Sequence, residues 1–406
     1  MIKITKEEAQ AFLLYRQGLL GDKIFSGKTG ILDYIKRVGS IQFDPVDVCG
    51  ISPEIALQAR VANFDKQLLA ALLYKERKLI DFFDKNLCIF PVEDLPMFVQ
   101  KYAGISYAES MARQSNEQVL QMIPKIREIL VKENFVFAKD LRHLEVENIV
   151  WDWGASSSVA RAALETMYFH GELIIHHKTG RQKAYGLAEK FLSSQLIMPQ
   201  QIFENEADYY QQLVLRRIGA VGLLWNKRSD AWLGIENFKA QARNQAFQEL
   251  LSSGAILEVA VSGMTESLYM KSTDKALLAK LSALTERVAR VEFLAPLDSL
   301  LWDRNLIKEI FDFDYKWEIY TPKEKRKYGA YVLPVIYGQN FIGRVEIERR
   351  TKESVLAVKN LWLEENEKFT PELEQAFSTC VERFKLFNDC EKIEYVKGWR
   401  VINGEK

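Results

Sequence analysis

A polar pair near the N-terminus has residue types that could carry out hydrolysis. Gln42 and Asp44 flank Phe43 in the segment Ser40–Pro45. If this segment is a short strand, Ile41 and Phe43 face the core, and Gln42 and Asp44 share the opposite face, roughly 6.6 Å apart along the chain. A carboxylate and a carboxamide placed together can position a water molecule and stabilise a developing cation. An Asp-Pro turn with a polar neighbour contains the same residues, and the spacing alone favours that turn.

Other catalytic motifs are missing from the sequence. The four cysteines and four histidines form neither an HExxH motif nor a cluster with metal-ligand spacing, so no zinc site is predicted. No GxxxxGK or GxGxxG loop occurs, which disfavours nucleotide hydrolysis and dinucleotide redox chemistry. We therefore expect no cofactor and no metal ion.

The composition indicates a folded protein of several domains. The chain has 406 residues, of which 48% are hydrophobic and 27% charged, and its 55 basic residues balance its 55 acidic ones. This length predicts two to four domains. No apolar stretch is long enough to span a membrane, and Met1–Lys6 lacks the apolar core of a signal peptide, so a cytoplasmic location is expected.

The clearest local pattern predicts a winged helix in residues 116–200. Ser156–Ser158 can cap a helix whose apolar residues from Val159 to Met167 recur with a helical period. Gly171 then stands where a left-handed helix end belongs. Two short strands joined by a turn follow, up to Tyr185. Helices followed by a two-stranded hairpin are typical of a winged helix.

The same order of elements recurs 83 residues later, in residues 201–290. A helix ending at Gly254 is again followed by two strands, which end near Tyr269. Residues 1–115 are a candidate third copy without an obvious hairpin, and residues 291–406 are a separate element with basic strands. The predicted fold class is α+β and mainly helical, with tandem winged-helix domains and a C-terminal antiparallel β-containing element.

Two sets of residues could contact DNA. Winged helices bind DNA through the start of their third helix and through the wing, and the basic, tyrosine-rich segment Lys316–Lys352 contains nine cations against four acids. Neither set requires DNA. A winged helix can have a polar, solvated wing and serve only in packing, and lysines on a strand edge can prevent aggregation. The candidate contacts are Ser156, Ser157, Ser158, Arg161, His176, Lys178, Arg181 and Lys183 in the first set, and Lys325, Arg326, Lys327, Tyr328 and Arg344 in the second.

Several motifs together resemble one family of enzymes. Gln42-Phe43-Asp44 is similar to the Gln-hydrophobic-Asp/Gln motif of the bacterial YcaQ and AlkZ-like DNA glycosylases. The C-terminal part also resembles this family over a long stretch. The matching segments there are residues 293–304, 311–315, 318–320 with Pro322, 327–335 and 343–345.

The resemblance implies a fold, an activity and a site. The family consists of tandem winged helices around a DNA-binding concavity, and its members excise alkylated purines. By resemblance, Asp44 is the catalytic carboxylate and Gln42 positions the water. The implied activity is that of a monofunctional DNA glycosylase acting on N7-alkylated purines in double-stranded DNA, with crosslinked lesions as a further candidate substrate. Tandem repeats within one chain make a monomer the expected state.

The sequence departs from the family pattern at two places and leaves alternatives open. The family often carries Trp and His where this chain has Phe83 and Lys85, and a His shortly after the Gln-x-Asp motif where residues 48–52 have none. A non-enzymatic winged-helix protein, either a transcriptional regulator or an architectural factor, has no need for the Gln42–Asp44 pair. A self-resistance protein against a DNA-alkylating natural product remains a third hypothesis.

Overall fold

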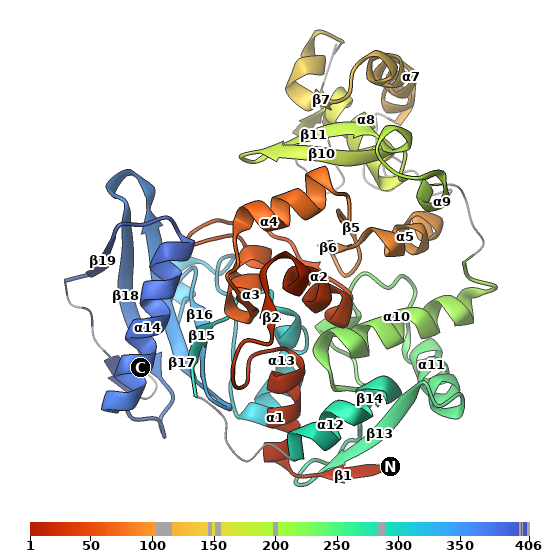
Figure 1. Ribbon diagram of the computed structural model, residues 1–406. Helices are drawn as coiled ribbons and strands as arrows, with labels where there is room; N and C mark the ends of the chain where they lie inside the picture. Colours follow the sequence, from red (N-terminus) through yellow and green to blue (C-terminus); the bar gives the residue numbers. More distant parts are fainter. Residues whose placement is uncertain are drawn as a thin grey trace. The chain divides into compact units, whose positions relative to one another are not determined.

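The chain forms two compact units (Figure 1). The computed structural model describes residues 1–102, 116–144, 148–150, 156–197, 202–282, 289–397, 399 and 401–403. Unit 1 combines Met1–Leu68 with Asn205–Lys406, and unit 2 comprises Leu69–Glu204. Both units contain helices and strands, and the sheet content is substantial. The predicted division into four domains remains a prediction.

The N-terminal part of unit 1 is a set of helices linked by very short strands. The first helix begins at a capping box in which Thr5 and Glu8 exchange hydrogen bonds of 2.8 and 3.1 Å. The elements are β1 (Ile2–Ile4), α1 (Lys6–Arg16), β2 (Phe25–Ser26), α2 (Gly27–Val38), β3 (Ile41–Gln42), α3 (Ser52–Arg60), β4 (Val61–Ala62) and α4 (Lys66–Ala70).

Unit 2 begins with a hairpin that the sequence analysis did not identify. Its two strands pair antiparallel, with Asp81 opposite Ile89. These strands are buried on both faces and carry one charged residue, Asp81, so they show no regular alternation that would mark them as a hairpin. The elements are a π-helical turn (Ala71–Lys75), β5 (Leu79–Phe83), β6 (Leu87–Pro91), a 3₁₀ turn (Val92–Asp94) and α5 (Leu95–Tyr102).

The rest of unit 2 contains the predicted helices and hairpin. Ser158 caps the central helix by accepting the Arg161 N–H, and Gly171 follows the helix with φ of 75°. The sheet order is β10-β11-β7, because a two-residue strand that the sequence did not reveal pairs with the hairpin. The elements are α7 (Asn116–Lys132), β7 (Val136–Phe137), a 3₁₀ segment (Ala138–Leu144), β8 (Asn148–Val150), β9 (Ser156–Ser158), α8 (Val159–Phe169), β10 (Leu173–Thr179), β11 (Gln182–Leu187), a 3₁₀ turn (Ala188–Lys190) and α9 (Ser194–Ile197).

Unit 1 contains the second copy of this order. Gly254 again follows the helix with positive φ, and a two-residue strand again completes the sheet. Strand β1 extends this sheet by pairing parallel with β13, giving the order β1-β13-β14-β12. The elements are α10 (Glu206–Val221), β12 (Leu224–Trp225), a 3₁₀ turn (Asp230–Trp232), α11 (Ala240–Ser252), β13 (Ile256–Val261), β14 (Leu268–Lys271), a 3₁₀ turn (Ser272–Asp274) and α12 (Lys275–Ser282).

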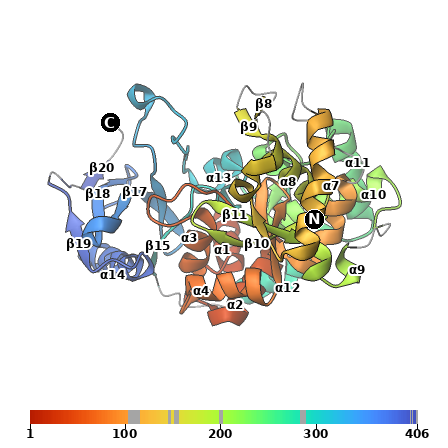
Figure 2. The ribbon, with the colours of Figure 1, turned by 90° about the horizontal axis from the view of Figure 1, so that it is seen from above.

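The C-terminal part is a six-stranded sheet with helix α14 beside it (Figures 1 and 2). The sheet is mixed rather than purely antiparallel as predicted, because β19 and β20 both pair parallel with β18. The elements are β15 (Val291–Phe293), a 3₁₀ turn (Ser299–Leu301), α13 (Arg304–Phe311), a 3₁₀ turn (Lys323–Lys325), β16 (Leu333–Tyr337), β17 (Asn340–Arg350), a 3₁₀ turn (Thr351–Glu353), β18 (Val355–Leu363), α14 (Pro371–Phe387), β19 (Lys392–Tyr395) and β20 (Val401–Asn403).

One hydrophobic core joins the C-terminal sheet to the segment that follows the Gln-Phe-Asp motif. Side chains from β15 to β18 and from α14 pack together, and Cys49, Ile55 and Ala56 belong to the same buried cluster. Val46 and Val48 pack against it. The loop after Asp44 is therefore held against the sheet by burial of apolar surface.

Candidate active site

The Gln-Phe-Asp motif spans the end of a very short strand. Strand β3 contains Ile41 and Gln42, contacts α3, and ends before Phe43. Gln42 is buried with 6% of its surface exposed, whereas Phe43 is half-buried. The alternation expected of a continuous strand over this segment therefore does not form, because the strand stops after two residues and the chain leaves the pleated geometry.

Asp44 lies at the start of a tight turn that orients its carboxylate. The Val46 N–H donates to Asp44 Oδ1 at 2.8 Å, across the intervening Pro45. This is the side-chain-mediated turn that an Asp-Pro sequence favours. Asp44 is partly exposed, and no described residue donates a hydrogen bond to its Oδ2 atom. The turn is thus compatible with a catalytic role of Asp44, since Oδ1 fixes the side chain and Oδ2 can contact a ligand.

The loop after Asp44 is anchored to β17 of the C-terminal sheet. Arg349 forms an ion pair of 2.6 Å with Asp47, and its backbone N–H donates to the Val48 carbonyl at 2.8 Å. The Tyr331 hydroxyl donates to the Gly50 carbonyl at 3.5 Å. Contacts from residues about 300 positions away in sequence therefore fix the loop that carries the motif.

Electrostatic coupling also links this loop to Tyr331. Burial first, and then nearby acidic groups that include Asp44 and Asp47, raise the pKa of Tyr331 well above its ordinary value. Tyr331 thus stays protonated at physiological pH, and its hydroxyl remains a hydrogen-bond donor beside the motif.

Gly50 is the position in this loop where a side chain does not fit. Its φ is 110°, and a Cβ atom there would lie 2.8 Å from the Phe387 ring and 3.2 Å from Ile55. We expect Gly50→Ala to lower the free energy of unfolding by about 2–3 kcal/mol, because overpacking adds to backbone strain. Chemical denaturation measures this loss. Gly254→Ala is the control, since that glycine has positive φ with no atom within 4 Å, and an equal loss in both variants would contradict the packing explanation.

Glu54 is an ionisable residue near this loop that the sequence analysis missed. It lies in the first turn of α3, where its N–H donates to the Ile51 carbonyl at 3.0 Å. Burial raises the pKa of Glu54 to about 7, with Asp47 acting in the same direction and Lys66 and Arg349 opposing it. Acidic residues are common in the first turn of helices, so the sequence does not single out Glu54. Its burial, which only the structure shows, distinguishes it.

This shift predicts a pH dependence of stability. Because the pKa of Glu54 is raised from 4.5 to about 7 on folding, the folded protein binds more protons between these values, and the free energy of unfolding falls as pH rises through them. The glutamine of Glu54→Gln does not titrate, so its free energy of unfolding should not fall in this way. We expect the difference in the free energy of unfolding between Glu54→Gln and the wild type to shift in favour of the variant by about 1–2 kcal/mol from pH 5 to pH 8. Denaturant unfolding at both pH values measures the gain, and a constant difference would contradict the raised pKa.

The predicted DNA contacts in unit 2 fall into two groups. Arg161 and Arg181 are exposed. By contrast, Lys178 is paired with Asp81 at 3.0 Å and Lys183 with Glu165 at 3.1 Å. These internal pairs leave the two lysines less able to contact phosphate than the exposed arginines.

Other members of this set lie in packed surroundings. His176 stacks on Phe135 at 4.8 Å between ring centroids, and burial, followed by Arg77 and His177, lowers the pKa of His176. His176 is therefore neutral at physiological pH. Ser158 uses its hydroxyl as a helix cap. Ser156 and Ser157 lie in β9, and their side chains fall outside the described part of the chain.

The predicted contacts near the C-terminus are corrected at one position. Arg344 is only 4% exposed, and its guanidinium lies over the rings of Phe313 and Tyr328 at 4.7 and 4.3 Å. It also pairs with Glu364 at 2.8 Å. Arg344 therefore packs in the interior and is not a surface contact. Tyr328 is half-buried, and its hydroxyl accepts a hydrogen bond from Arg344.

The remaining basic residues of this set lie on a loop. Lys325 and Lys327 are exposed, whereas Arg326 is half-buried and donates to the Thr321 carbonyl at 2.7 Å. Two exposed cations thus remain from the five positions that the sequence indicated here.

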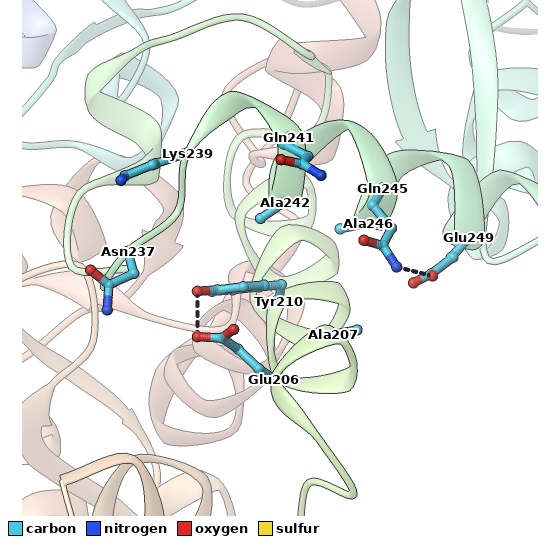
Figure 3. A pocket seen from close by; sticks show the side chains of 10 residues that line it. All are labelled: Glu206, Ala207, Tyr210, Asn237, Lys239, Gln241, Ala242, Gln245, Ala246 and Glu249. Atoms are coloured by element: carbon cyan, nitrogen blue, oxygen red, sulfur yellow. Dashed lines mark hydrogen bonds between the residues drawn. The ribbon is translucent and has the colours of Figure 1, made fainter.

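A hollow elsewhere in unit 1 is separate from the motif (Figure 3). It has a volume of about 330 Å³ and lies between the start of α10 and the length of α11 from Gln241 to Glu249. Glu206 accepts the Tyr210 hydroxyl there at 2.8 Å. Its lining includes no residue of the 40–50 segment. Among the described side chains, no cluster of three or more His, Cys, Asp or Glu is arranged to hold a metal ion.

The helices of the described segments are also too short or too polar to cross a lipid bilayer.

Comparison with known proteins identifies the family. A family model described as DNA glycosylase AlkZ-like matches residues 35–387. The solved structure of Streptomyces sahachiroi DNA glycosylase AlkZ is similar in fold, with a TM-score of 0.61 and 14% identity, and the match covers 99% of this chain and 100% of that one. Since the family model spans most of the sequence, including both the Gln-Phe-Asp motif and strands β15 to β18 of the C-terminal sheet, the chain belongs to the AlkZ-like family of DNA glycosylases.

Proposed function

We propose that this DNA glycosylase is monofunctional and hydrolyses the N-glycosidic bond of N7-alkylated purines, with Asp44 as the catalytic carboxylate and Gln42 as its partner. The observation that supports this site most directly is the turn at Asp44, which fixes Oδ1 on the Val46 N–H at 2.8 Å. A preorganised carboxylate stabilises charge without first having to reorient. The family match supplies the reaction class.

The chemistry suits a single carboxylate. An N7-alkylated purine carries a positive charge, so it leaves readily as a neutral base. Its departure creates an oxocarbenium-like sugar, as in glycoside hydrolysis. Asp44 would stabilise this cation and accept a proton from the attacking water, and Gln42 would orient that water. No lysine nucleophile is required, so the DNA strand stays intact after base release.

We also propose that the two repeated segments are winged helices that bind double-stranded DNA. Each has a helix, a two-residue strand, a helical turn, a second helix and a hairpin, in that order. Exposed Arg161 and Arg181 lie where a recognition helix and a wing would contact phosphates. Such repeats within one chain support action as a monomer. Crosslinked lesions, which the enzyme would unhook by the same base release, are a second substrate class.

Base release from a defined duplex tests the substrate. The probe is a duplex with one N7-methylguanine, and alkali converts each abasic product into a strand break. We expect breaks only after alkali treatment, and none with the unmodified duplex. Strand breaks without alkali would contradict the monofunctional mechanism. If the enzyme leaves N7-methylguanine in place but releases a bulkier or crosslinked base, that lesion class would replace N7-methylguanine as the substrate.

A purely regulatory DNA-binding role is disfavoured. Membership in a glycosylase family accounts for the Gln42–Asp44 pair, for which a regulator has no use. General DNA repair and self-resistance to a DNA-alkylating natural product are two biological roles that the same base-release reaction could serve.

A further inference from the structure

The segment between α13 and β16 forms a loop whose two ends are held together by one carboxylate. Glu318 accepts hydrogen bonds from the backbone N–H groups of Lys327, Tyr328 and Gly329 at 2.9, 2.9 and 3.2 Å. Although burial opposes ionisation, these donors lower the pKa of Glu318, so the clamp is charged at neutral pH. The cyan loop with its 3₁₀ turn extends away from the sheet in Figure 2.

Tyr320 is the aromatic residue that this loop presents to solvent. Its exposed fraction of 81% exceeds that of every other large hydrophobic residue in the described part of the chain. Its ring packs edge-on against Trp317, with centroids 5.8 Å apart. Isolated exposed apolar residues are common on protein surfaces. Here, however, the residue is held on a clamped loop that also carries exposed Lys323, Lys325 and Lys327.

A continuous set of aromatic contacts connects Tyr320 to the Asp44 loop. Trp317, which contacts Tyr320, also packs against Tyr331 with centroids 6.1 Å apart. Tyr331 in turn donates to the Gly50 carbonyl, and the charge of Asp44 contributes to its electrostatic environment. All these residues belong to unit 1. The exposed ring is therefore positioned by the same packing that positions the candidate catalytic loop.

We propose that Tyr320 is a DNA-stacking residue, whose ring lies against a nucleobase next to the lesion while the lysines of the loop contact the flanking phosphates. The inference deepens the proposed function and rests on it for the location of the lesion near Asp44. Every base presents a π-face, so stacking requires no particular sequence, and alkylated or unpaired steps are the easiest to unstack. Lysines around the ring supply the charge that a duplex requires.

The test compares Tyr320→Ala and Tyr320→Phe in DNA binding. The probe is a labelled duplex that contains a tetrahydrofuran abasic-site analogue beside 2-aminopurine, because this duplex is not a substrate for base release. We expect Tyr320→Ala to bind about 5- to 100-fold more weakly, to lose the 2-aminopurine fluorescence change, and to keep the salt dependence of the wild type. Tyr320→Phe keeps the ring and should behave like the wild type.

Two further variants serve as controls. Lys325→Gln should reduce the slope of log K against log salt by about one, which separates a phosphate contact from a stacking contact. Tyr395→Ala removes an exposed tyrosine of the same unit, on β19, and should leave binding unchanged. Equal melting temperatures for all variants would show that the loop mutations do not act through folding.

The outcomes separate this inference from the proposed substrate. Binding by Tyr320→Ala within twofold of the wild type, or equal losses in the Ala and Phe variants, would overturn the stacking role even if N7-methylguanine is released. Weaker binding by Tyr320→Ala together with no release of N7-methylguanine by the wild type would support the stacking role and reject the substrate.

Discussion

Asp44→Asn is expected to lower the single-turnover rate of N7-methylguanine release by about 10²- to 10⁴-fold, the range typical of a lost catalytic carboxylate. The asparagine amide oxygen can still accept the Val46 N–H that Asp44 Oδ1 accepts at 2.8 Å. The turn should therefore persist, and the loss should reflect the missing negative charge. Single-turnover assays with excess enzyme measure the rate without a contribution from product release.

Three comparisons make this prediction specific to the site. Asp44→Asn should melt at the wild-type temperature and bind DNA no more weakly, because removing a negative charge does not oppose binding to phosphates. Gln42→Ala should lose about 10- to 100-fold in rate, since it positions water without carrying charge. Asp314→Asn is the matched control and should keep the wild-type rate, because this carboxylate pairs with Lys308 at 2.7 Å on the surface, away from the motif. Wild-type rates in both Asp44→Asn and Gln42→Ala would move the chemistry away from the motif.

The largest expected effect on stability comes from the buried ion pair between Arg60 and Asp298. Both side chains have no exposed surface, and they form two parallel hydrogen bonds of 2.7 and 2.8 Å. Asp298→Asn leaves the guanidinium buried without its counter-charge, so the free energy of unfolding should fall by about 3–5 kcal/mol. Urea unfolding followed by tryptophan fluorescence measures this loss.

Two variants test the electrostatic origin of that loss. Asp314→Asn removes a carboxylate that pairs with Lys308 at 2.7 Å on the surface, and it should cost about 0–1 kcal/mol. Replacing both Arg60 and Asp298 with leucine removes both buried charges and should cost less than Asp298→Asn alone. A double variant that is less stable than the single one would indicate that hydrogen bonds and shape, rather than charge, dominate at this position.

The sequence alone predicted the elements whose signals are local. The helix cap at Ser158 and the positive φ at Gly171 and Gly254 are confirmed, because caps and turns depend on a few adjacent residues. The hairpins that follow both glycines are also confirmed.

The short strands and the buried hairpin could not be predicted in this way. Strands β7 and β12 have two residues each, too few for any periodic pattern. Strands β5 and β6 are buried on both faces and mostly apolar, so their composition does not distinguish them from a buried helix. In both cases the segment becomes a strand because it pairs with a partner strand, and its own sequence does not reveal that pairing.

What the sequence determined by itself was the motif, the family resemblance and the local caps, because these depend on residue identity and short spacing. Only the tertiary structure decided which polar side chains are accessible. Arg344 is buried between Phe313 and Tyr328, and Lys178 is neutralised by Asp81. Such partners lie 16 to 97 residues apart in the sequence, and burial and ion pairing depend on distance in space rather than along the chain.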